Sequence, residues 1–195
     1  MSTETRPTYE LGRRIVVWGV TGSGKTTLAR RLGETLGLGV VELDAIRHEH
    51  GWNSVDWPEF RERLTATLDG YPDGWVVEGS YSRIMDVYLS RADTMIWMHL
   101  PFRVSFWRLL QRTVRRAWTR EPMYNPYGPR ESWRLSFFSR KSILWWGVSM
   151  HRYSVRTRRE RIALLPPTVR VYELRSAREV AVLLRELSVV ERVRN

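Results

Sequence analysis

Eight consecutive residues near the N-terminus have the types and the spacing of a phosphate-binding loop. The run Gly19-Val20-Thr21-Gly22-Ser23-Gly24-Lys25-Thr26 satisfies the full G-x-x-x-x-G-K-[ST] pattern, between a β-branched stretch and a helical one. Its glycines let backbone N–H groups turn inward around a polyphosphate, and the N-terminus of the following helix adds partial positive charge. The alternative is a glycine-rich turn with an incidental lysine, which the intact pattern disfavours. The sequence therefore predicts a nucleoside triphosphate site.

The polar side chains of this loop suit ATP with Mg²⁺. Lys25 can reach the β- and γ-phosphates, the hydroxyl of Thr26 can ligate the metal ion, and Thr27 is expected to contact the α-phosphate. Only two of the 32 basic residues are lysines, Lys25 and Lys141, which indicates that lysine is chemically required at position 25. The residues predicted to bind the nucleotide are Gly19, Thr21, Gly22, Ser23, Gly24, Lys25, Thr26 and Thr27.

The elements that must position this loop alternate along the chain. Strands are predicted at residues 13–18, 39–43, 75–77, 94–100 and 169–174, and helices at 26–36, 56–69, 82–90, 102–120 and 176–187. Strands that alternate with helices specify a parallel sheet covered by helices on both faces, with ligands at the carboxyl ends of the strands. The predicted fold class is α/β: a P-loop NTPase with three α/β/α layers, a parallel sheet and a helical, arginine-rich lid insertion.

The length of 195 residues favours a single domain. Its core is expected at about residues 13–110 and 166–190, and the lid-like insertion at about 111–165. Prolines and a glycine break residues 121–130, and residues 131–165 are rich in arginine, tryptophan and phenylalanine with a patchy helical pattern. We therefore expect one P-loop domain, residues 1–195, that carries the insertion within it.

Three further segments, with the P-loop, resemble a known family over about residues 13–120. They are the E-L-D run at 42–44, the W-V-V-E-G-S-Y run at 75–81 and the L-P pair at 100–101 before an arginine-rich helix. The chain resembles the adenylate-kinase-like P-loop kinases, particularly the small bacterial proteins labelled DNA topology modulation proteins or adenylate-kinase-related kinases. This resemblance implies an enzyme, an ATP-dependent phosphotransferase that uses Mg²⁺ and a small-molecule acceptor, possible acceptors including a nucleotide or nucleoside.

The resemblance also assigns roles to residues after the second and third strands. It implies that Asp44 faces the acceptor or the magnesium, where a carboxylate can orient or deprotonate an attacking hydroxyl, whereas the alternative is a helix cap. It places Glu78 near the metal ion or the acceptor. Arg83 is a candidate for binding an acceptor anion, with a solvated charge on a helix surface as the alternative.

The predicted helix at 102–120 carries an arginine stripe. Apolar residues recur at helical spacing at Phe102, Phe106, Leu109, Leu110, Val114 and Trp118, which predicts the buried face. Arg108, Arg112, Arg115 and Arg116 fall on another face. By resemblance Arg112, Arg115, Arg116 and Arg120 are lid arginines that stabilise charge during transfer, and a basic exposed face is the alternative.

The charge distribution leaves two other function classes open. Residues 101–195 hold 21 Lys and Arg against 7 Asp and Glu, a field that attracts phosphates. Aromatic residues interleave with these charges from about 133 to 153, so a nucleic-acid-associated regulatory NTPase is an alternative to the kinase. An amphipathic surface for a membrane or partner chain is a third hypothesis. The position of the stripe, and the lack of a recognised nucleic-acid module, favour the kinase.

The composition and the N-terminal residues indicate the cellular compartment of the protein. The chain has no cysteine, and its N-terminal residues lack the apolar core of a signal peptide. No stretch reaches the apolar length that crosses a bilayer, so no transmembrane segment is expected. These features favour a cytoplasmic protein.

Overall fold

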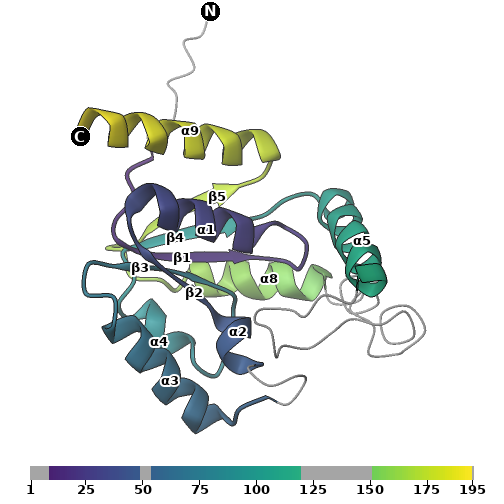
Figure 1. The fold of residues 1–195 in the computed structure, drawn as a ribbon, viewed down its shortest axis with the longest axis horizontal. Helices are drawn as coiled ribbons and strands as arrows, with labels where there is room; N and C mark the ends of the chain where they lie inside the picture. Colours follow the sequence, from purple (N-terminus) through teal and green to yellow (C-terminus); the bar gives the residue numbers. More distant parts are fainter. Residues whose placement is uncertain (1–8, 49–53, 120–150, 195) are drawn as a thin grey trace, which may run out of the picture.

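A five-stranded parallel sheet forms the centre of the computed structural model, which describes residues 9–48, 54–119 and 151–194 (Figure 1). The strands are β1 (Arg14–Gly19), β2 (Gly39–Glu42), β3 (Trp75–Glu78), β4 (Thr94–Met98) and β5 (Arg170–Leu174). Their order is β2-β3-β1-β4-β5, and every neighbouring pair is parallel. The parallel sheet expected from the sequence is confirmed, although the fourth strand ends at residue 98 and not at residue 100.

Seven helices are described around the sheet. They are α1 (Lys25–Leu36), α2 (Leu43–Arg47), α3 (Trp57–Asp69), α4 (Met85–Leu89), α5 (Phe102–Thr119), α8 (His151–Ile162) and α9 (Ala177–Arg194). Side chains cap two of these helices: the Asp56 side chain accepts a hydrogen bond from the Glu59 N–H (2.8 Å), and the Ser176 hydroxyl accepts one from the Glu179 N–H (3.1 Å). The helix expected at 82–90 is shorter, and helix α2 occupies positions where a strand end and a loop were predicted.

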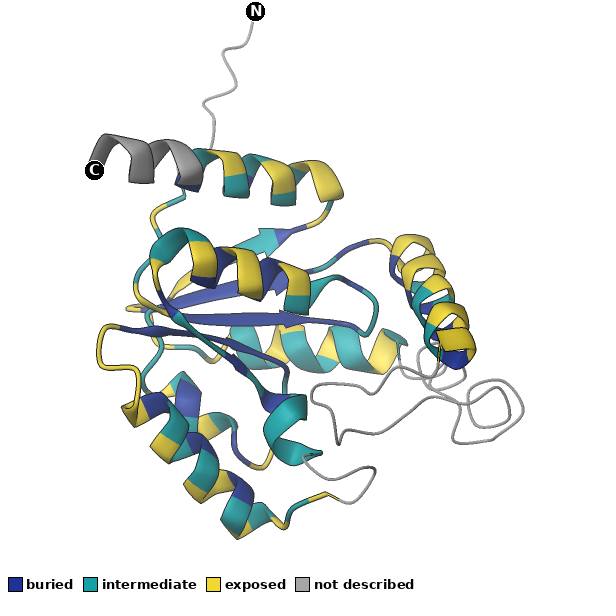
Figure 2. Cartoon of the chain, in the orientation of Figure 1, coloured by how far each residue is buried: buried dark blue, intermediate teal, exposed yellow. Residues whose placement is uncertain are grey.

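The core consists of two apolar layers, one on each face of the sheet. In β1, Val16 and Trp18 belong to the layer beneath α3, α4 and α8, whereas Ile15 and Val17 belong to the layer beneath α1 and α9. Figure 2 shows the central strands buried, apart from the exposed Arg14 at the start of β1. Strands covered on both faces must be apolar at successive positions, which explains the continuous hydrophobic run of β1. The predicted three-layer α/β/α fold is confirmed.

The connections that leave the neighbouring strands β1 and β3 run toward opposite edges of the sheet. The loop after β1 leads to α1 on one face, and the segment after β3 leads to α4 on the opposite face (Figure 1). Two neighbouring parallel strands whose connections diverge in this way leave a crevice at their carboxyl ends, where α/β proteins bind ligands. Helix α5 lies beyond the same ends of the strands.

The buried face predicted for α5 is confirmed at Leu109 but wrong at Phe102, Val114 and Trp118. The buried residues of the helix are Ser105, Leu109, Thr113 and Ala117, whereas Phe102 is 36% exposed and Trp118 is 79% exposed. The reason is a close approach to the P-loop, because a Cβ atom at Gly22 would lie 2.2 Å from the carbonyl oxygen of Ser105. The side of α5 that carries Ser105 and Leu109 therefore faces the loop, and Phe102 and Trp118 lie outside.

Part of the expected insertion lies against the sheet. Val155 and Ile162 of α8 pack on the core layer that contains Trp97, and the guanidinium of Arg159 lies 5.8 Å from the centre of that indole ring. Residues 120–150, which contain most of the interleaved aromatic and basic side chains and Arg120, fall outside the described residues. The role of the insertion as a lid therefore stays a prediction. No helix in the described part of the chain is long and apolar enough to cross a membrane.

Candidate functional site

The P-loop forms an anion cradle between β1 and α1. Gly22 (φ 82°) and Gly24 (φ 93°) adopt left-handed backbone conformations that favour glycine, and Gly24 is the N-cap of α1. No side chain caps this helix, and its first turn contains no acidic residue. Its first N–H groups and its dipole are thus left for an external anion, a good fit to the phosphates of ATP.

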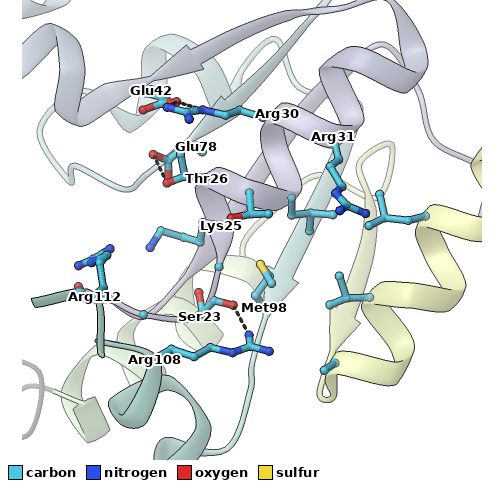
Figure 3. Close-up of a pocket in the computed structure, with 18 of the residues that line it drawn as sticks. Ser23, Lys25, Thr26, Arg30, Arg31, Glu42, Glu78, Met98, Arg108 and Arg112 are labelled. Carbon is cyan, nitrogen blue, oxygen red and sulfur yellow. Dashed lines mark hydrogen bonds and ion pairs between the residues drawn. The ribbon is translucent and has the colours of Figure 1, made fainter. Parts of the chain in front are cut away.

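A cavity of about 940 Å³ opens at the P-loop (Figure 3). Its walls come from residues 21–28, from the carboxyl ends of β2, β3 and β4, and from helices α1, α5 and α9. The arginines that line it are Arg30, Arg31, Arg108, Arg112, Arg115, Arg116 and Arg185, and the carboxylates are Glu42, Asp44 and Glu78. The excess of positive charge favours a polyanionic ligand, and the volume is ample for a nucleotide.

The base of the cavity holds a buried acid beside the lysine of the loop. The Thr26 hydroxyl donates a hydrogen bond to Glu78 Oε1 (3.1 Å), and Glu78 is only 3% exposed. Burial raises the pKa of Glu78, while the nearby Lys25 ammonium acts in the opposite direction. Burial likewise lowers the pKa of Lys25, partly offset by Glu78. Lys25 itself donates to the Val20 carbonyl oxygen (3.2 Å).

These groups also suit a magnesium ion. A threonine hydroxyl and one or two carboxylates are the hard oxygen donors that Mg²⁺ takes from P-loop proteins, with phosphate oxygens and water completing its shell. Within the described residues no group of three or more acidic or histidine side chains could hold a metal ion alone. The donors present therefore fit a metal ion that arrives with the nucleotide better than one held by the protein.

The buried glutamate makes stability depend on pH in a testable direction. Because the folded-state pKa of Glu78 lies above its unfolded value, its contribution is fully present below the unfolded pKa and is lost as pH rises through the folded pKa. Glu78→Gln, which mimics the neutral acid, is expected to raise the melting temperature of the unliganded protein near neutral pH. The gain should shrink as the pH falls toward about 4.3, the unfolded value.

Thermal unfolding followed by circular dichroism across this pH range measures the effect. Glu62→Gln is the matched control, because Glu62 is an exposed residue of α3 and does not line the cavity. The control should unfold as wild type does at each pH. A Glu78→Gln protein that melts below wild type at neutral pH would contradict the expectation.

Asp44 lies in the first turn of α2, on the wall of the cavity. The Tyr81 hydroxyl donates a hydrogen bond to its Oδ1 atom (2.6 Å). The helix-cap alternative is wrong for α2, because Glu42 occupies the N-cap position and Asp44 comes two residues later. Its carboxylate is thus oriented by a tyrosine and directed to the same cavity as Lys25.

Four arginines of α5 face the loop. Arg108 donates to the Ser23 carbonyl oxygen (3.4 Å), and Arg112 is close enough to lower the pKa of Lys25, although burial is the larger cause. Figure 3 shows Arg112 and Arg108 on the side of the cavity opposite α9, and Arg115 and Arg116 also line it. Their spacing of four, three and one residues places all four along one side of the helix.

Arg83 is not brought to this cavity. Its guanidinium lies 5.1 Å from the ring centre of Trp57, and its carbonyl oxygen accepts a hydrogen bond from Arg61 (3.0 Å). Sequence reasoning overlooked two other arginines, namely Arg47 of α2 and Arg158 of α8. In a chain with 30 arginines nothing in their local sequence distinguishes them, because only the fold stacks Arg47 on Trp57 and brings Arg158 to Ser80.

Comparison with known proteins supports the fold. No family model matches the chain, and no curated protein matches its sequence. Among solved structures, a gluconokinase from Sinorhizobium meliloti 1021 has a TM-score of 0.51 at 18% identity, over 95% of this chain and 94% of its own. The chain shares its fold with a solved kinase. A protein from Chloroflexus aurantiacus j-10-fl has a TM-score of 0.53 at 17% identity, over 90% of this chain and 96% of its own. A protein from Thermus thermophilus has a TM-score of 0.52 at 15% identity, over 93% of this chain and 98% of its own.

Proposed function

We propose that this protein is an ATP-dependent kinase that moves the γ-phosphoryl group of Mg·ATP to a hydroxyl group of a small acceptor. One observation carries the proposal: the P-loop lysine, a row of α5 arginines and the tyrosine-oriented Asp44 line a single cavity. A phosphate loop alone suits any NTPase. A carboxylate on the wall beside the loop adds a group that can accept the proton of an attacking hydroxyl.

Each group of residues in the cavity has its own role in this proposal. Bound ATP supplies the phosphoryl group, and Mg²⁺ neutralises part of its charge. The first-turn N–H groups of α1 and Lys25 bind phosphate oxygens, and the Thr26 hydroxyl with Glu78 would hold the metal ion. The arginines of α5 stabilise charge on the group in transfer, and Asp44 takes the proton from the acceptor hydroxyl. Catalysis would rest on positioning and electrostatics.

The nucleoside end of ATP has a suitable wall on the far side of the loop. Ala177, Val180, Ala181 and Leu184 of α9 line the cavity there, next to Arg31 and Arg185. An apolar surface beside these two arginines suits the base and the ribose of ATP. The similarity to a gluconokinase supports the kinase assignment at the level of fold. We retain the adenylate-kinase-like subgroup and a cytoplasmic location as parts of the proposal.

The test is ADP production by the purified protein with Mg·ATP and a panel of acceptors. The panel contains nucleoside monophosphates, nucleosides, sugars, sugar acids and sugar phosphates. The proposal expects one class to raise ADP production well above the rate without acceptor, with a phosphorylated product. Hydrolysis that no acceptor stimulates would overturn the kinase and favour the regulatory NTPase, which salt-dependent DNA binding would then support.

The lid arginines give a separable prediction. Arg115→Ala with Arg116→Ala is expected to lower kcat by roughly 10²-fold or more, because charge that develops in the transition state loses its nearest donors. The dissociation constant of an unreactive ATP analogue should change far less. Arg103→Ala is the control, since this exposed arginine of the same helix does not line the cavity. Equal losses in kcat and in analogue affinity would count against a transition-state role.

A further inference from the structure

Outside the residues that line the cavity, α8 brings the partly buried guanidinium of Arg158 to the segment that follows β3. Arg158 donates from Nη2 to the Ser80 hydroxyl (3.2 Å) and from Nη1 to the Ser154 carbonyl oxygen (3.0 Å). Both partners are neutral. Its Nε atom is buried and has no hydrogen-bond partner among the described residues. A charged group is therefore held partly out of water with no carboxylate partner among the described residues.

This arrangement is costly for the unliganded protein. A charge removed from water needs an opposite charge or a full set of hydrogen bonds, and removal of its partner typically costs several kcal/mol. Burial lowers the pKa of Arg158 to about 10, and the nearby Arg161 adds to the effect. No carboxylate of the described residues forms an ion pair with Arg158. An anion from outside the chain would compensate for this cost.

Arg47, three residues after Asp44 on α2, is a second partly buried arginine. Its guanidinium stacks on Trp57, 4.3 Å from the ring centre, and its Nη1 atom is buried without a hydrogen-bond partner in the described parts of the chain. Trp57 in turn packs edge-on against Tyr81, at 6.2 Å between ring centres. Since Tyr81 holds Asp44 and follows Ser80 directly, both arginines are tied to the same short segment after β3.

Arg158 is also close to the reacting end of the nucleotide site. Both Arg158 and Asp44 act on the charge of Lys25, the first lowering and the second raising its pKa, beside the dominant lowering by burial. A small molecule whose anionic group lies at Arg158 would thus keep its other atoms within reach of Asp44 and the P-loop. Two planar guanidinium groups also match the geometry of carboxylate or phosphate oxygens.

We propose that Arg158, with Ser80 and Arg47, binds an oxyanion group of the phosphoryl acceptor, so that the substrate is a hydroxyl compound bearing a carboxylate or a phosphate. This inference rests on the proposed kinase function and narrows its acceptor. Arg158 takes the role that the sequence suggested for Arg83, which lies instead over Trp57 and is not in the cavity wall. A neutral sugar or nucleoside would leave both arginines uncompensated.

Matched acceptor pairs test the inference by turnover. Wild-type protein is assayed with glucose against gluconate, glucose against glucose 6-phosphate, and a nucleoside against its monophosphate. The anionic member of one pair is expected to have the higher kcat/KM, and the gluconate and phosphate arms separate a carboxylate from a phosphate. Arg158→Gln should reduce that kcat/KM by roughly 30- to 1,000-fold, mainly through KM, as loss of one partner of a buried charge pair does.

Arg156→Gln is the matched control, because this exposed arginine of α8 pairs only with Glu160 on the same helix among the described residues (2.8 Å). It should keep wild-type acceptor kinetics. A neutral acceptor that outperforms its anionic partner, with a KM that Arg158→Gln does not change, would overturn the inference and leave the kinase intact. If Arg158→Gln does not fold, Arg47→Met decides the question by the same KM criterion.

A binding measurement separates this inference from the proposed function. With an unreactive ATP analogue and Mg²⁺ saturating the P-loop, inorganic phosphate or gluconate should raise the melting temperature of wild type and of Arg156→Gln, but not of Arg158→Gln. Without an oxyanion, Arg158→Gln should melt at or above the wild-type temperature, because a buried uncompensated charge is removed. Absence of any oxyanion-dependent shift would overturn the inference even if a kinase activity is found.

Discussion

Lys25→Ala is expected to reduce acceptor-dependent ADP production by roughly 10²- to 10³-fold or more, the loss typical of removing one preorganised donor from a transition state. The ammonium group lies in a partly buried site between the P-loop and Glu78, where its attraction to phosphate is stronger than in water. Its removal also leaves Glu78 without its principal positive neighbour. Steady-state kinetics with Mg·ATP and the best acceptor measure the effect.

Arg14→Ala is the control for this variant. Arg14 is an exposed cation at the start of β1, at the end of the strand remote from the P-loop, so its loss changes net charge equally without touching the site. It should retain wild-type turnover. If Lys25→Ala and wild type hydrolyse or transfer at the same rate, the P-loop has no part in the activity, and both the ATP site and the kinase proposal fall.

Asp44→Asn is expected to lower kcat by roughly 10²- to 10⁴-fold, the range for loss of a general base. Asparagine keeps the size of the side chain and can still accept the hydrogen bond from Tyr81, but it cannot take a proton from the acceptor hydroxyl. The KM for ATP should change little, because the phosphates bind to the loop and to α5. The variant is compared with wild type in kcat and in both KM values.

Tyr81→Phe distinguishes positioning from proton transfer. It removes the hydroxyl that orients Asp44 and leaves the carboxylate in place, so its loss in kcat should be smaller than that of Asp44→Asn. Glu59→Gln, a change to an exposed acid that pairs with Arg63 on α3, should leave kcat unchanged. An Asp44→Asn protein with wild-type kcat but a raised KM for magnesium would show that Asp44 serves the metal ion and not the proton.

The nucleotide site could be predicted from the sequence because it is built from consecutive residues. The glycines at 22 and 24, Lys25 and Thr26 occupy one turn of chain, and the left-handed conformations found there are those that the pattern requires. The parallel sheet followed from the same kind of local signal, since strands buried on both faces read as continuous apolar runs. The starts of α3 and α9 are also local features, because Asp56 and Ser176 each bond to a backbone N–H three residues away.

The buried face of α5 could not be predicted in this way. Apolar spacing pointed to Phe102 and Trp118, yet Ser105 and Ala117 are buried, because the helix turns the side that carries Ser105 and Leu109 toward Gly22 of the P-loop. Periodicity reports how apolar a face is. It does not report how close the neighbouring backbone lies. At the contact between α5 and the P-loop, the short distance between the backbones determined which face of the helix is buried, and hydrophobicity did not.

The acceptor side of the site depends on the tertiary structure most of all. By itself the sequence determined the phosphate loop, the order of strands and helices and the excess of arginine, since each is a local pattern or a composition. Only the tertiary structure decided which arginines matter, placing Arg83 over Trp57 and bringing Arg158 from α8 to Ser80, 78 residues earlier in the chain. Arginines are alike in sequence, and their burial and partners arise only when distant elements pack together.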